Sequence, residues 1–114
     1  MMDVLNQDKI DRLASEIGAD NVPILLDIFL GELAQYMSKL TSDPDLDVTS
    51  YLKEISHALK SSAASFGAES LCAYAIEIDS MAKAGQAFDL ESTKQNMVAL
   101  LKETEQRYQE LVAQ

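Results

Sequence analysis

The stretch from residue 52 to residue 68 reads LKEISHALKSSAASFGA and decides how the chain folds. Its apolar residues recur at helical spacing, at Leu52, Ile55, Leu59, Ala63 and Phe66. Because an α-helix has 3.6 residues per turn, this spacing gathers the side chains into one apolar stripe. The pattern predicts a helix that packs its stripe on a core and ends at the glycine that follows.

His57 is the only histidine among the 114 residues. At 100° per residue it lies roughly 160° from the centre of the stripe, so we expect its ring on the outer side of the helix. Residues three, four and seven positions away share that side. They include two lysines, Lys53 and Lys60, and two small residues, Ser61 and Ala64. The sequence therefore predicts an exposed imidazole in mid-helix, with a cation on each side and no large side chain over it.

Composition restricts the class of protein before any further motif is considered. Hydrophobic residues make up 47% of the chain and charged residues 25%, which is typical of a globular protein. We expect one domain spanning residues 1–114, long enough for a real core. The formal net charge of −10 argues against nucleic acids and anionic membranes as partners, because both require a basic surface.

We expect the protein to stay in the cytoplasm. Cys72 is the single cysteine, so no disulfide can form within the chain, and a reducing compartment is the default. No apolar run approaches the ~18 residues of a membrane span. The first residues also lack the basic start and apolar body of a signal peptide.

Capping residues and breaks set the expected limits of the other helices. A short amphipathic helix over residues 6–18 should stop at a glycine, and the next helix can be capped by Asp20 or Asn21 and run to about Leu40. Residues 41–47 form the clearest break, from which Asp47 can start the histidine helix. A fourth helix should close near residue 84, and Asp89 can cap a fifth.

The predicted fold class is all-α: an antiparallel up-down four-helix bundle with a short N-terminal fifth helix as a lid. Ile24, Ile28 and Leu30 widen the apolar stripe of the second helix, so we expect that helix to be largely buried or to contact several neighbours. In the last helix we expect Leu90 to point inward. No alternation of apolar and polar residues suggests a strand.

Several kinds of chemistry lack their motifs. A structural zinc site needs about four His or Cys ligands, and the chain has one of each. There is no Walker loop, no G-x-G-x-x-G and no G-x-S-x-G elbow, so neither a nucleotide site nor an α/β-hydrolase is indicated. We therefore expect no cofactor and no metal, which leaves His57 as the one candidate nucleophile.

His57 has two interpretations on the residues alone. It can be an ordinary surface histidine, or a nucleophile that a macromolecular partner reaches. Lys53 and Lys60 favour the second, because ammonium groups make charge-assisted hydrogen bonds to a phosphoryl group attached to the ring. Ser61 and Ala64 favour it as well, because small residues leave the ring accessible.

Residues 57–68, HALKSSAASFGA, resemble the signature H-x-L-K-G-x-x-x-x-x-G-A of the histidine phosphotransfer (HPt) family. The match departs at Ser61, where the family usually has glycine. Serine is also small, so access to the ring should survive. Residues 3–7, 21–32 and 51–68 further resemble family members that act in bacterial quorum sensing.

The resemblance implies a phosphoryl carrier rather than an enzyme. His57 would accept a phosphoryl group, by family analogy on Nε2, from the phospho-aspartate of a receiver domain in a hybrid sensor kinase. It would then donate the group to the receiver domain of a response regulator. The receiver would supply Mg²⁺ and an acidic pocket, Lys60 and Lys53 would offset phosphoryl charge, and Ser61 and Ala64 would belong to the docking surface.

Two rival interpretations remain. The phosphoacceptor helix of a histidine kinase has the signature H-E-[LI]-[RK]-x-P, but Ala58 and Ser62 stand here where that family has its acid and its proline. A passive helical adaptor without phosphoryl chemistry fits an acidic bundle equally well, and only the surroundings of His57 argue against it. A self-contained bundle with one exposed histidine is compatible with a monomer.

Overall fold

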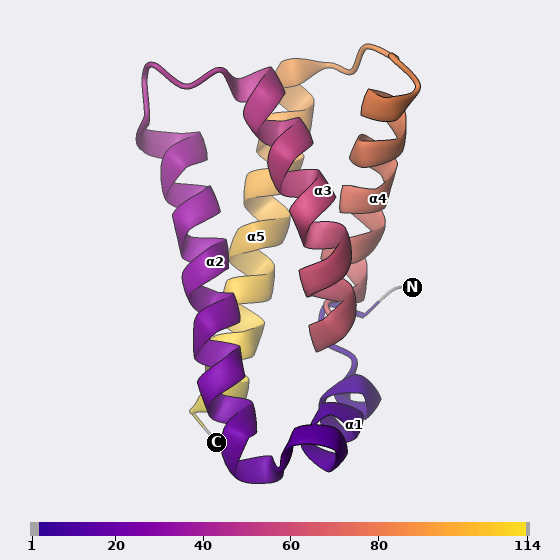
Figure 1. Ribbon diagram of the computed structural model, residues 1–114. Helices are drawn as coiled ribbons and strands as arrows, with labels where there is room; N and C mark the ends of the chain where they lie inside the picture. The colour runs from indigo at the N-terminus through magenta and orange to yellow at the C-terminus, as the bar shows by residue number, and fades with distance from the viewer. Residues whose placement is uncertain (1–2, 114) are drawn as a thin grey trace.

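A computed structural model describes residues 3–113, and every regular element within that range is helical. In chain order they are α1 (Gln7–Ile17), the short 3₁₀ helix η1 (Ala19–Asn21), α2 (Val22–Ser42), α3 (Val48–Phe66), α4 (Glu69–Lys83) and α5 (Leu90–Val112). Figure 1 shows α2 to α5 alternating in direction, with α1 at the end of the bundle where α2 begins and α3 ends. This arrangement confirms the predicted up-down bundle with an N-terminal lid.

The four long helices associate mainly as two pairs. α3 packs most extensively on α4, and α2 packs most extensively on α5. Contacts between α2 and α3 are much sparser, although the two helices are consecutive in the chain. The main neighbour of the histidine helix is therefore α4.

Aspartate caps begin two of the long helices as predicted. The side chain of Asp47 accepts a hydrogen bond from the amide of Ser50, and Asp89 accepts one from Ser92. Of the two residues predicted to cap α2, Asn21 occupies the N-cap position, but its side chain makes no capping bond there. Asn21 instead donates its side-chain amide to the carbonyl oxygen of Ile17, at 2.7 Å.

The end of α2 also differs from the prediction. α2 continues two residues past Leu40, to Ser42, and Asp43 then adopts an extended conformation. The steric effect of Pro44 falls on the residue directly before it, so proline excludes only Asp43 from the helix. The break at residues 41–47 is therefore shorter than the sequence indicated.

Gly67 ends α3 in a left-handed conformation, with a φ of 78°. The N-terminal segment crosses directly over this turn, because the amide of Asn6 donates to the carbonyl oxygen of Gly67 at 2.8 Å. A Cβ atom on Gly67 would lie 2.9 Å from the carbonyl oxygen of Asn6. Glycine is thus required twice, for the turn and for the close approach of α1 to the histidine helix.

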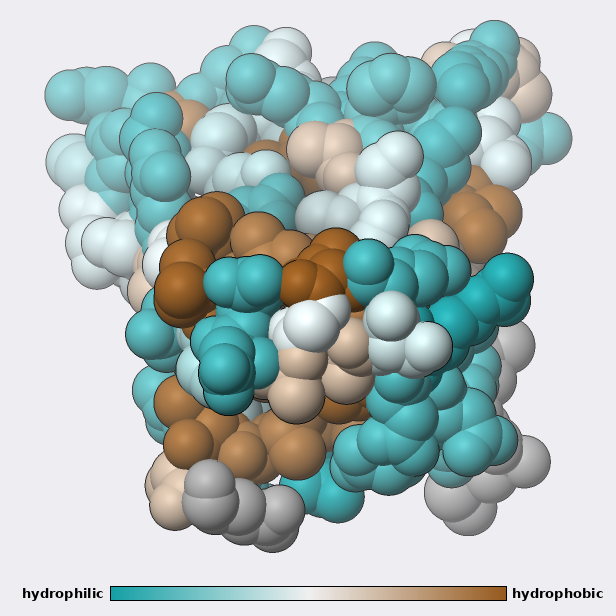
Figure 2. Space-filling model, turned by 60° about the horizontal axis from the view of Figure 1, so that its bottom comes forward, coloured by the Kyte–Doolittle hydropathy of each residue, from teal (hydrophilic) through white to brown (hydrophobic). Residues whose placement is uncertain are grey.

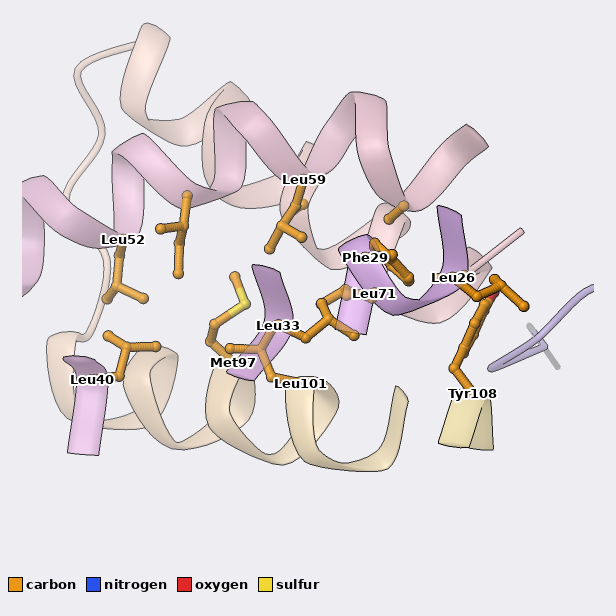
Figure 3. Packing of buried hydrophobic residues seen from close by; sticks show 14 of the residues in the cluster. Leu26, Phe29, Leu33, Leu40, Leu52, Leu59, Leu71, Met97, Leu101 and Tyr108 are labelled. Atoms are coloured by element: carbon orange, nitrogen blue, oxygen red, sulfur yellow. The ribbon is translucent and has the colours of Figure 1, made fainter. Parts of the chain in front are cut away.

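The core fills the space between the four long helices. Figure 3 shows side chains from all four converging on one interior. At the end of the core nearer α1, the Phe29 ring stacks on Phe66 with centroids 4.7 Å apart, and Tyr108 meets Phe29 edge-on at 5.3 Å. The Tyr108 hydroxyl donates to the carbonyl oxygen of Phe66 at 2.6 Å, so the polar atom of this buried ring is satisfied.

Three residues expected to point inward are exposed instead. Ile24 and Ile28 are 59% and 65% exposed, and Leu90 is 41% exposed. α2 buries one stripe, mainly against α5, so a second apolar row has no neighbour to cover it. In α5 the inward position near the start is taken by Thr93 rather than Leu90. Over residues 3–113, no helix has the length and apolar character needed to cross a bilayer.

Candidate functional site around His57

The His57 ring stands on the surface in the middle of α3. Its side chain is 68% exposed, while the flanking residues Ile55, Ser56 and Leu59 are buried. This agrees with the orientation expected from the helical spacing. Ser61 and Ala64, one and two turns further along, are also exposed and place no bulk over the ring.

One ring nitrogen is bound and the other is free. Nδ1 of His57 lies 3.2 Å from Oδ1 of Asp79, a residue of α4 whose side chain is only 7% exposed. Nε2 has no hydrogen-bond partner among residues 3–113. The nitrogen that a partner can reach is therefore Nε2, which has an unshared electron pair when the proton is on Nδ1.

Asp79 also binds two lysines through its second oxygen. Oδ2 lies 2.7 Å from Nζ of Lys60 and 3.0 Å from Nζ of Lys83. The hydrogen bond from Lys60, then that from Lys83, holds the pKa of the Asp79 carboxyl well below its usual range, and His57 contributes in the same direction. The same contact raises the pKa of Lys60. These four side chains form a cluster of one carboxylate, two ammonium groups and one imidazole, which we call the Asp79 cluster.

Lys60 and Lys53 have different surroundings in the structure. Lys60 belongs to the Asp79 cluster, and its side chain is 30% exposed because it reaches sideways to α4 rather than straight outward. Lys53 is exposed and lines a separate hollow with Thr49, Ala82 and Phe88, at the connection between α4 and α5. Lys60 thus binds Asp79, the residue that is hydrogen-bonded to the ring, whereas Lys53 lies outside the Asp79 cluster.

Sequence reasoning missed Asp79 and Lys83. A signal existed in α4, because Asp79 is an acid next to the buried positions Ala75 and Ile78, with a lysine four residues further on. A buried acid requires a partner. That this partner includes His57 follows only from the pairing of α3 with α4, which residue spacing within one helix does not reveal.

Exposed apolar residues lie beyond the histidine, toward the end of α3, on both neighbouring helices. Toward α2, the hydroxyls of Ser62 and Tyr36 both donate to Glu32 Oε2, at 3.3 and 2.6 Å. Ile28 lies one helical turn from Glu32 on the same face of α2, and so close to the end of α3. Toward α4, Ala64 and the exposed Ile76 line a shallow apolar depression. No group of three or more His, Cys, Asp or Glu residues within 3–113 is placed to hold a metal ion.

The four-helix bundle and the exposed imidazole on one of its long helices agree with what the HPt resemblance of residues 57–68 implied. The Hpt domain family matches this chain over residues 24–114, and the chain belongs to that family. The resemblance carried by residues 57–68 is thereby confirmed.

Among individual proteins, the chain is 60% identical to the phosphorelay protein LuxU of Vibrio cholerae serotype O1, over 98% of this chain and 99% of that protein. It is 57% identical to the phosphorelay protein LuxU of Vibrio harveyi, over 93% of each. The crystal structure of histidine-containing phosphotransfer protein B from Pseudomonas aeruginosa PAO1 matches with a TM-score of 0.79, over 96% of this chain and 95% of that one. At 18% identity, this last likeness concerns the fold alone.

Proposed function

We propose that His57 carries the phosphoryl group in a phosphorelay, receiving it from one receiver domain and passing it to another. The donor is the phospho-aspartate of a hybrid sensor kinase, and the acceptor is the aspartate of a response regulator. Residues 1–114 act as one HPt domain, as a monomer in the cytoplasm. The relatives named LuxU favour a quorum-sensing pathway.

The observation that carries the proposal is the state of the His57 ring. A phosphoryl acceptor needs an accessible nitrogen with an unshared electron pair, held in a constant orientation. The side chain is 68% exposed, Nδ1 is hydrogen-bonded to Asp79, and Nε2 makes no hydrogen bond to any residue of the described chain. The passive adaptor gives no reason for a buried carboxylate to be directed at a surface histidine.

The two lysines of the Asp79 cluster would offset the charge of the transferring group. Positioning and charge neutralisation provide most of the catalysis in phosphoryl transfer. Lys60 and Lys83 are bound to the carboxylate that binds the ring, so they are the cations nearest to the Nδ1 side of His57 that the ion pairs place, and either could turn toward a group attached to the ring. Lys53 would act from further away. The receiver supplies Mg²⁺ and the acidic pocket that contains its aspartate.

The receiver would dock on the exposed small and apolar residues around the ring: Ser61, Ala64, Ile24, Ile28 and Ile76, which we call the docking surface. Figure 2 brings forward the end of the bundle where α1 and the start of α2 lie, and shows hydrophobic surface there surrounded by hydrophilic side chains. An apolar centre inside a polar rim is the usual composition of a protein–protein interface. A partner that contacts Ser61 and Ala64, which share the outer side of α3 with His57, would also reach the His57 ring.

The test is phosphoryl uptake from a phosphorylated receiver domain in the presence of Mg²⁺. We expect the native chain to take up phosphate that is stable in base and labile in acid, as a phosphoramidate is. His57→Gln, which keeps a polar side chain of similar size, should take up none while retaining its helical circular dichroism spectrum. Uptake by the Gln variant, or no uptake by the native chain from several receivers, would favour the passive adaptor.

A further inference from the structure

We propose that a hollow between α2 and α3 receives the guanidinium group of an arginine on the receiver that docks at His57. The inference rests on the function proposed above and names one contact that would hold the partner. The hollow has a volume of about 430 Å³, and we call it the α2–α3 hollow. Its charged and aromatic lining residues are Tyr36, Lys39, Asp47, Tyr51 and Glu54. None of these belongs to the docking surface, so the hollow is a separate site.

The α2–α3 hollow exists because α2 and α3 have few contacts with each other. Their connection lies at the end of the bundle away from α1 (Figure 1), and α3 packs far more on α4 than on α2. Two aromatic rings line the space left between them. The Tyr36 ring of α2 meets the Tyr51 ring of α3 edge-on, with centroids 6.3 Å apart. One side of the hollow is therefore aromatic.

A cation of the chain itself already lies on this aromatic side. Nζ of Lys39 is 5.4 Å from the centroid of the Tyr51 ring, which is within the range of a cation–π contact. Lys39 is exposed, and it forms no ion pair within residues 3–113. The ring face therefore suits a cation, and the ammonium group that occupies it is held by no carboxylate.

Glu54 and Asp47 supply negative charge beside the ring. Glu54 is exposed and has no ion-pair partner within residues 3–113. The pKa of the Tyr51 hydroxyl is raised, first by burial and then by the charge of Glu54, so this carboxylate acts on the ring. Asp47 accepts hydrogen bonds from the amide and the hydroxyl of Ser50, which lower its pKa. The hollow thus combines an aromatic face with two carboxylates and one displaceable ammonium group.

A guanidinium group matches this combination better than an ammonium group does. It is planar and more weakly hydrated, so it can stack on the Tyr51 ring while its N–H groups donate to the carboxylate of Glu54. Such a hydrogen bond joins two charged groups and is stronger than one between neutral groups. The formal net charge of −10 also attracts basic groups of a partner as it approaches.

The position of the α2–α3 hollow relative to His57 favours the receiver as the source of the arginine. Glu54 lies three residues before His57, on the same outer side of α3. Ala58, the residue after His57, lines the hollow. A receiver whose aspartate reaches the His57 ring is therefore within about one helical turn of the hollow. An arginine on its docking face would enter there without touching the transferred group.

The first test is an NMR titration of the unphosphorylated chain with N-acetyl-arginine methylamide as the probe. We expect the probe to shift the signals of Tyr36, Tyr51 and Glu54. The citrulline analogue has nearly the same shape but no charge, and it should leave these signals unchanged. Equal shifts with the two compounds, or no shift with the arginine probe, would overturn the proposal.

Two variants and two controls define the contacts in the same titration. Lys39→Ala should strengthen binding of the probe about threefold, because it removes the competing cation from the ring. Glu54→Gln should weaken binding about threefold, because it removes an exposed charge pair. Lys102→Ala on α5 and Glu77→Gln on α4 change exposed residues outside the hollow and should leave the affinity unchanged. An affinity that does not respond to Glu54→Gln would contradict the proposed site.

The second test measures the affinity of the receiver itself by calorimetry. Glu54→Gln should weaken receiver binding about threefold at low salt and less at high salt, where the charges are screened. Glu77→Gln should bind as the native chain does. If Glu54→Gln left receiver affinity unchanged while the free probe still bound, the guanidinium would come from a small molecule, and the proposal would be overturned. Neither test requires phosphoryl transfer, so its outcome is distinct from that of the His57→Gln experiment.

Discussion

Replacing Gly67 with alanine adds a Cβ atom at the point where the histidine helix ends beneath the N-terminal segment. The new atom would lie 2.9 Å from the carbonyl oxygen of Asn6 and 3.0 Å from Cβ of Lys9. Both distances are too short for non-bonded atoms, so the start of α1 must shift. The shift breaks the 2.8 Å hydrogen bond between the amide of Asn6 and the carbonyl oxygen of Gly67.

Four contributions give the size of the effect. A left-handed conformation costs an alanine about 1 kcal/mol, and the overpacked contact with Asn6 costs about 1.5 kcal/mol. The lost hydrogen bond adds about 1 kcal/mol, while the smaller entropy of the unfolded chain returns about 0.5 kcal/mol. The sum is a loss of about 3 kcal/mol in the free energy of unfolding, or roughly 15 °C in Tm for a domain of this size.

Gly85→Ala is the matched control for the overpacked contact. Gly85 also has a positive φ, 70°, but no atom lies within 4 Å of the position its Cβ would take. Only the conformational contributions apply there, so the loss should be about 0.5 kcal/mol. Urea unfolding followed by far-ultraviolet circular dichroism measures both variants. If Gly67→Ala lost no more stability than Gly85→Ala, the close approach of Asn6 would contribute nothing, and our account of the lid would be refuted.

Three further predictions concern the site. Lys60→Ala should slow phosphoryl uptake about tenfold through loss of one charge-assisted hydrogen bond. Lys102→Ala is the exposed control in the same assay, and an equal effect of both substitutions would contradict the role assigned to Lys60. Ile28→Asp should weaken receiver binding at least tenfold in calorimetry, because it removes apolar burial. Leu90→Asp, the control, should not. Equal affinities of the two variants for the receiver would exclude α2 from the docking surface. Because the pKa of folded Asp79 is lowered, its contribution to stability is complete above about pH 4 and declines as the pH falls further. The stability difference between the native chain and Asp79→Asn should therefore be larger at about pH 7 than at about pH 3 in urea titrations, and a constant difference would contradict the ion pairs.

Much of the fold could be predicted because the sequence signals for each helix lie within its own segment. The apolar stripe of α3, its aspartate cap and its terminal glycine all depend on residues within the same segment. The errors arose where burial depends on a neighbour. Ile24 and Ile28 fit an apolar face of α2, yet no helix packs against that face, so hydrophobicity alone could not decide between core and surface.

The site divides in the same way. The outward orientation of His57 follows from the angle between residues on one helix, so the sequence was sufficient. The contact with Asp79 joins residues 22 positions apart on two helices, and nothing in either segment specifies which faces meet. The two lysines predicted to flank the ring have different contacts for the same reason. Lys60 binds the carboxylate of Asp79 on α4, whereas Lys53 lines a separate hollow.

The exposure of the His57 ring bears on how long a phosphoryl group would persist on it. A side chain that is 68% exposed is open to water as well as to a protein partner. A phosphoryl group stored there would decay at a rate close to that of the unprotected chemical bond whenever no receiver is docked. Under the function proposed above, such a carrier would keep no record of past stimulation. Its loaded fraction would follow the present balance between the domains that supply the phosphoryl group and those that remove it.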